Sequence, residues 1–131
     1  MNRDIAKLWI DALQSGDYRQ TTGALCRTAK DGTKSYCCLG VLCELYQQHA
    51  DVSLDVDTRE DSATGTTLKL YNRLDDFLPQ PVRVWAGMKT NDGEFGYPDP
   101  VYRHDNLVAI NDDDADFDEM AELIKEYVNI L

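Results

Sequence analysis

The chain has 131 residues, of which 43% are hydrophobic and 28% are charged, and its formal net charge is −11 at pH 7. This length suits one globular domain with a single core, and this apolar content excludes wholesale disorder. The acidic balance makes duplex DNA or RNA an unfavourable partner, because binding it requires neutralised phosphates. The acidic excess lies after residue 48 and favours a basic protein partner, although acidic surfaces also simply keep small proteins soluble.

The start of the chain, Met1 to Asp4, has no basic segment leading into an apolar run, so we expect no secretory signal. No apolar run approaches the roughly 18 residues that a membrane-spanning helix needs. We therefore expect a cytoplasmic protein without a membrane partner. Its four cysteines should be free thiols, because disulfides are rare in the cytosol.

Apolar residues recur at helical spacing between residues 3 and 14 and predict an amphipathic helix there. Asn2 is a suitable N-cap for this helix, and Ser15-Gly16 is a suitable end. The polar residues 17–23 then link the helix to the next element.

A β-hairpin is predicted next, with strands over residues 24–29 and 35–39. Asp31-Gly32 between the strands is a strong signal for a two-residue turn. In that register Cys26 lies directly opposite Cys37.

The hairpin leads directly into a helix over residues 38–49, where apolar side chains fall on one helical face. Residues 52–56 alternate between apolar and polar, which is typical of a half-exposed strand. Residues 58–67 have little apolar content and predict a mobile loop. Apolar spacing in residues 68–78 favours a short helix, which Pro79 would end.

Pro81 suits the first turn of another short helix, and Gly87 suits its end. Trp85 on this helix is expected in the core, with a place at the mouth of a pocket as the alternative. Residues 91–93, Asn-Asp-Gly, predict a second tight turn. Residues 97–100 should be extended, because a residue that precedes proline avoids the helical region.

The acidic run over residues 112–119 has two interpretations. Its first acids fit the start of a calcium-binding loop, but Phe117 stands where that loop requires glycine and Leu123 where it requires glutamate. A helix start explains the run better, with Asp116 as N-cap and Glu119 completing a capping box. The last amphipathic helix should follow.

These elements predict an α+β fold in a single domain over residues 1–131. A central antiparallel β-hairpin would pack against the helix that follows it. The N- and C-terminal amphipathic helices would complete the core.

The cysteines raise two chemical alternatives, a zinc site and a catalytic nucleophile. The chain has no Cys-x-x-Cys pair, and Cys37 and Cys38 would point to opposite faces of a strand, which disfavours zinc. A nucleophilic cysteine needs a base, and neither His49 nor His104 is tied to a cysteine by its spacing. We therefore expect buried thiols, with no catalytic residue, metal site or cofactor.

Two segments combine aromatic side chains with cationic or amide donors in an otherwise acidic chain. Such a combination suits a planar ligand or a protein partner. The alternative is structural: the first segment would be a solvated connector whose tyrosine packs on the helix, and the second a loop that folds its aromatic side chains onto the core. With an anionic nucleotide, an arginine should contact the phosphate and a tyrosine should stack on the base. The candidate ligand-binding residues are Tyr18, Arg19, Gln20, Tyr97, Tyr102, Arg103 and His104.

Three strings in the chain are Cys37-Cys38-Leu39-Gly40-Val41-Leu42-Cys43, Leu78-Pro79-x-x-Val82-x-x-Trp85-Ala86-Gly87 and Ile110-Asn111-Asp112. With these strings the chain resembles a family of small proteins encoded by phages and prophages. The resemblance covers most of the chain, although residues 88–106 match no motif of it. It implies a setting, the inside of an infected bacterium, and no activity.

We expect an accessory protein of this type that acts by binding and not by catalysis, in the cytoplasm of the host bacterial cell. It would sequester or inhibit a host defence protein or the small anionic nucleotide that signals for it. One alternative is a small enzyme that depends on Cys37 or Cys43, and another is an acidic DNA mimic that inhibits a nucleic-acid-binding protein. The sequence leaves a homo-oligomer open.

Overall fold

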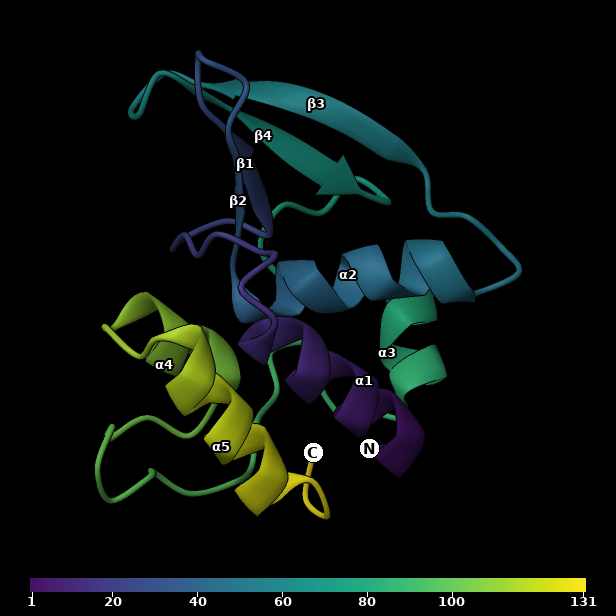
Figure 1. Ribbon diagram of the computed structural model, residues 1–131, viewed down its shortest axis with the longest axis vertical. Helices are drawn as coiled ribbons and strands as arrows, with labels where there is room; N and C mark the ends of the chain where they lie inside the picture. The colour runs from purple at the N-terminus through teal and green to yellow at the C-terminus, as the bar shows by residue number, and fades with distance from the viewer.

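Helix α2 lies between the sheet and the other helices in the computed structural model, which describes all 131 residues (Figure 1). The four strands form one antiparallel sheet at one end of the molecule, which confirms the predicted α+β class. No helix is both long and apolar enough to cross a membrane. In chain order the elements are α1 (Arg3–Gln14), β1 (Cys26–Thr28), β2 (Lys34–Tyr36), α2 (Cys38–His49), β3 (Val56–Asp61), β4 (Thr66–Tyr71), α3 (Gln80–Ala86), α4 (Leu107–Asp112) and α5 (Phe117–Tyr127).

Helix α2 is buried almost all round, because the sheet covers one side and α1, α3 and α4 pack against the others. A helix that is apolar on every side is suited to such a central position. This helix therefore connects the sheet with the other helices. Its buried residues are Cys38, Leu39, Gly40, Val41, Leu42, Cys43, Leu45 and Tyr46.

Helices α1 and α5 lie side by side although the whole chain separates them (Figure 1). Each presents an amphipathic face, and Ala6, Ile10 and Leu13 of α1 are buried. The indole of Trp9 is also fully buried, and its Nε1 donates to the Cys38 carbonyl at 2.8 Å. This bond fixes α1 against the first turn of α2.

The hairpin of β1 and β2 has a register one residue away from the prediction. Cys26 lies opposite Tyr36 and not opposite Cys37. The Ala29 N–H already donates across the hairpin, so the loop holds three residues, and Gly32 closes it with a φ of 87°. Three-residue hairpin loops place a positive-φ residue in this position. The Asp-Gly pair therefore marked the turn correctly but not its length, and both strands are shorter than predicted.

A second hairpin, β3–β4, takes up most of the loop predicted over residues 58–67 and the start of the helix predicted over residues 68–78. No helix forms in this stretch, so both predictions were wrong. Strand β3 is exposed on both faces, so it lacks the apolar alternation that marks a strand. The apolar residues with helical spacing lie on both sides of a backbone turn after β4, where Asn72 and Arg73 have positive φ. The strand predicted over residues 52–56 begins only at its last residue.

The helix ends follow the predicted caps. The Asn2 side chain accepts two backbone N–H groups at the start of α1, and Gly87 ends α3 with a φ of 67°. Asp116 and Glu119 form the predicted capping box at the start of α5. Local hydrogen-bonding chemistry was therefore a reliable guide to these boundaries.

The turn predicted at residues 91–93 does not join two paired strands. Glu94 pairs instead with Asn106, which caps the short helix α4 that the sequence did not predict. Gly93 packs closely on Leu107, so a Cβ there would lie 2.8 Å from a side-chain carbon. The glycine serves tertiary packing in this position.

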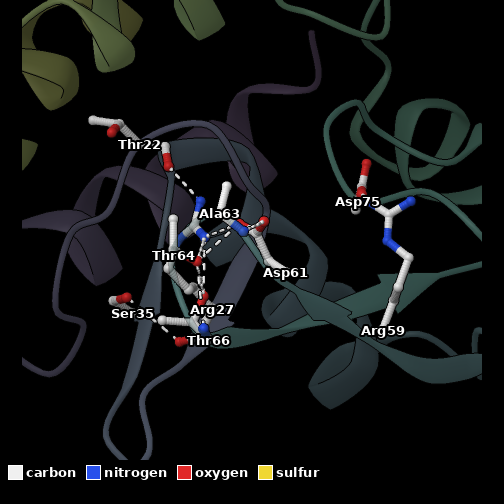
Figure 2. Close-up of polar contacts among 9 residues, drawn as sticks. All are labelled: Thr22, Arg27, Ser35, Arg59, Asp61, Ala63, Thr64, Thr66 and Asp75. Carbon is white, nitrogen blue, oxygen red and sulfur yellow. Dashed lines mark hydrogen bonds and ion pairs between the residues drawn. The ribbon is translucent and has the colours of Figure 1, made fainter.

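Arg27 ties the β3–β4 hairpin to β1 (Figure 2). Its Nη1 donates to Asp61 at 2.8 Å and to the hydroxyls of Thr64 and Thr66 at 3.0 Å. Its Nη2 donates to the Thr22 carbonyl at 3.2 Å, so one guanidinium joins the link, the sheet and the turn of the second hairpin. A planar guanidinium suits such a fixed set of acceptors.

Candidate functional site

The residues predicted in the link are used mostly by the fold. Tyr18 packs edge-on against the Tyr36 ring at a centroid distance of 5.4 Å. The Gln20 amide donates to Asn111 at 2.9 Å and to the Ala115 carbonyl at 2.7 Å. Arg19 is exposed, and its side chain makes no hydrogen bond or ion pair within the protein.

The second predicted segment also makes internal contacts. The Tyr102 hydroxyl donates to Glu119, and the His104 imidazole bonds to Asp113 at 2.9 Å. Arg103 is exposed with a φ of 64°. Tyr97 keeps half of its surface exposed and packs edge-on against the aromatic rings of Phe95 and Tyr127.

The two predicted segments do not form one binding site. Gln20 reaches the junction of α4 and α5, and His104 and Tyr102 bond to other acids of the same region. No surface hollow is lined by residues 97–104. A phosphate near Tyr102 and His104 would meet the carboxylates to which they are bonded, and like charges repel.

The four cysteines are buried free thiols. Burial raises the pKa of every one of them, to about 12 for Cys37. Nucleophilic cysteines need the opposite shift and a nearby base. His104 is bonded to Asp113 and His49 is exposed, so this environment disfavours a cysteine-dependent enzyme. No group of three His, Cys, Asp or Glu side chains is placed to hold a metal ion.

A polar hollow of about 400 Å³ lies on the sheet, between Thr28, Lys34, Thr58 and Lys69. Two lysines and several hydroxyls could in principle attract an anion. The Lys69 ammonium is already paired with Glu44 at 2.6 Å, however, and the Tyr71 hydroxyl donates to the same carboxylate. Only Lys34 remains unpaired there, which is little positive charge for a phosphate on an acidic protein.

The largest hollow is an apolar groove of about 550 Å³ between the C-terminal end of α2 and helix α3. We call it the α2–α3 groove. Tyr46, Pro81 and Trp85 form its walls, and Val52 and Val84 stand on its rim. The valines are 71% and 63% exposed, so the groove presents apolar surface that the fold itself does not cover.

Helix α3 builds one wall because its two faces differ. Val82 and Ala86 are buried in the core, which turns Val84 outward and leaves Trp85 partly exposed at the groove. The Trp85 ring meets Tyr46 of α2 edge-on at 5.5 Å. This aromatic pair joins the walls that α2 and α3 contribute to the groove.

The chain after α2 builds the other wall. It leaves the helix in an extended conformation at Ala50, and the Gln47 side chain then accepts the Leu54 N–H at 2.9 Å. Leu54 is buried, so it anchors the segment, and Asp51 and Val52 are held at the groove.

Sequence reasoning found part of this groove. The alternative place for Trp85, at the mouth of a pocket, matches its position, whereas His49, considered only as a partner for a cysteine, is exposed at the groove. Val84 could have been predicted as a groove residue, because it is a large apolar residue on the outer side of a two-turn helix. Val52 could not, since it was predicted in a strand.

Comparison with known proteins gives one match. A family model described as a domain of unknown function (DUF8296) matches residues 1–128. No curated protein and no solved structure matches the chain.

Proposed function

We propose that this protein, which belongs to the DUF8296 family, acts by binding another protein through the α2–α3 groove and not by catalysis. The observation that carries this proposal is the exposed apolar rim of Val52 and Val84 beside Trp85. The resemblance to phage and prophage proteins supplies the proposed setting, a host bacterial cell. The proposed consequence is inhibition of a host protein.

The chemistry of the groove supports a protein ligand. Hydrophobic contacts contribute about 25 cal/mol for each Å² of apolar surface removed from water, and exposed valines beside an aromatic pair offer such surface. Binding hot spots are rich in tryptophan and tyrosine in pockets that can be desolvated. A volume of about 550 Å³ can receive side chains of a partner segment.

The nucleotide alternative has less support. It needs a free cation beside a free aromatic face, and Tyr102 and His104 are engaged with carboxylates. The DNA-mimic alternative needs rows of free acids, whereas Asp61, Asp99 and Asp116 are bound to donors within the protein. The apolar groove has no such internal partner.

Co-purification with matched variants tests the proposal. The tagged protein is expressed in a bacterial host, and partners are identified by mass spectrometry and then purified for direct titration. Val84→Asp should weaken binding by about a hundredfold, because a charge in the groove opposes desolvation. Val101→Asp is the control, since Val101 is 75% exposed and lies outside the groove. Equal binding by both variants would refute the site.

A further inference from the structure

The α2–α3 groove has one electronegative end. Helix α2 ends at His49, which lines the groove. The backbone carbonyl of His49 has no donor within the protein, and neither have those of Gln47 and Gln48 in the same last turn. Unpaired carbonyls at a helix C-terminus carry partial negative charge. Asp51 follows two residues later on the groove lining and adds a full negative charge.

The walls beside this end are aromatic. Trp85 and Tyr46 present ring surface to the groove, and Val84 and Pro81 extend the apolar part. Aromatic faces attract cations as well as apolar groups. A cationic and an apolar side chain of a partner can therefore bind next to each other in the groove.

No lysine or arginine lines the groove. Asp51 is the only acidic residue in the lining, and His49 is the only residue there with a basic side chain. Asp51 makes no ion pair within the protein. The negative end is therefore not neutralised by a salt bridge from the protein itself. The acidic excess after residue 48 reinforces the same sign over a longer range.

We infer that the groove receives a basic amphipathic segment of a partner protein, with an apolar side chain against Trp85 and Val84 and a lysine or arginine at the end formed by Asp51 and the α2 carbonyls. This inference rests on the proposed function and names the chemistry of its partner. Lysine and arginine suit this end because each can donate several hydrogen bonds to carbonyl and carboxylate oxygens.

Three synthetic peptides test the inference. They share the same leucine positions and carry lysine, glutamine or glutamate at all others. Binding is followed by titration and by the indole N–H signals in NMR spectra, of which the protein has two, from Trp9 and Trp85. The Trp85→Phe variant assigns them. The lysine peptide should shift the Trp85 signal and bind about tenfold more tightly than the glutamine peptide, with the glutamate peptide weakest.

Matched variants separate the groove from general acidity. Asp51→Asn should weaken the lysine peptide about fivefold and leave the glutamine peptide unchanged. Asp17→Asn should change neither, because Asp17 is exposed, outside the groove and without a side-chain partner. Equal effects of these two variants would overturn the inference, since long-range charge would then explain the preference.

The outcomes distinguish the inference from the proposed function. If all three peptides bind equally and Val84→Asp abolishes each complex, the groove binds proteins but the inferred basic partner is wrong. If Val84→Asn, which removes apolar surface without adding a negative charge that would attract the lysines, leaves the lysine peptide's binding unchanged, both the site and the inference fail. If sedimentation shows a dimer that Val84→Asp dissociates, the occupant is a second copy and the inference is overturned.

Discussion

Gly40 of α2 lies against the backbone of Leu25, so closely that a Cβ on Gly40 would stand 1.7 Å from the Leu25 carbonyl oxygen. No real side chain fits in that space, and the obstacle is backbone that cannot rotate away. Helix α2 therefore passes Leu25, the residue before β1, at a distance that only glycine permits.

Gly40→Ala should destabilise the protein by about 3 kcal/mol or more, because the helix must move away from the Leu25 backbone. Denaturant unfolding measures the change. Gly96→Ala is the matched control, since Gly96 has a φ of 88° and open space around it. That variant should cost about 1 kcal/mol for its backbone conformation alone. Equal costs would show that the crossing is not tight.

Arg27→Ala should loosen the β3–β4 hairpin locally, because the guanidinium holds Asp61, Thr64 and Thr66 at once (Figure 2). We expect amide hydrogen exchange in the turn at residues 62–65 to accelerate about tenfold, while exchange in α2 stays slow. Arg59→Ala removes a more exposed arginine, which pairs with Asp75, and should change stability by less than about 0.5 kcal/mol.

Asp116→Ala should destabilise the protein by about 1 kcal/mol through loss of the α5 cap. The Asp116 carboxylate accepts the Glu119 N–H at 2.8 Å, and Glu119 accepts the Asp116 N–H in return. Asp118→Ala, in the same turn without a cap bond, should cost less than about 0.5 kcal/mol. Thermal unfolding compares the two, and a larger loss in Asp118→Ala would contradict the capping role.

Asp99 should contribute to acid unfolding. Burial raises the pKa of Asp99, but hydrogen bonds from the Tyr102 N–H, the Tyr127 hydroxyl and the Val101 N–H outweigh it and hold the pKa below its ordinary value. A carboxyl whose pKa is lower in the folded state stabilises the fold above the unfolded pKa of about 4.

This stabilisation is lost as the pH falls through the folded-state pKa of Asp99, because the unfolded chain then binds the proton more readily. The free energy of unfolding, measured between pH 6 and about pH 2, should therefore fall more steeply in the wild type than in Asp99→Asn. Parallel pH profiles would show that Asp99 does not carry this effect.

The four thiols should resist alkylation in the folded protein. Burial raises the pKa of Cys37 to about 12 and raises the pKa of Cys38 and Cys43 as well, so little reactive thiolate forms at neutral pH. Iodoacetamide should label all four in urea and none in buffer. Rapid labelling of Cys37 or Cys43 in the native state would revive the cysteine-enzyme alternative.

The sequence predicted those parts of the fold that depend on local chemistry. Asn2, Gly87 and Asp116 mark helix ends because a side-chain acceptor or a positive φ is needed at each place. Strand β3 was missed because both of its faces are exposed, and a strand without a buried face has no alternating pattern. The hairpin register was missed because a two-residue Asp-Gly loop needs positive φ at both Asp31 and Gly32, and only Gly32 has it.

The groove could be predicted less well than the fold. Its aromatic wall contains Trp85, and the sequence pattern of one short helix was enough to suggest the place of this residue. Its rim needs Val52, which reaches the groove only because Leu54 and Gln47 anchor the chain after α2. A surface made by segments that meet only in the folded protein leaves no signal in either segment alone.

The pairing of α1 with α5 has a consequence for the protein's synthesis on the ribosome. Helix α1 is translated before every other element of this domain, yet α5, which covers its apolar face, is translated after all of them. At about 5–20 residues per second, Ile10 and Leu13 stay without this cover for on the order of ten seconds. Throughout that interval the part of α1 that α5 will cover stays exposed, and chaperones that recognise exposed apolar surface can bind it before the domain closes.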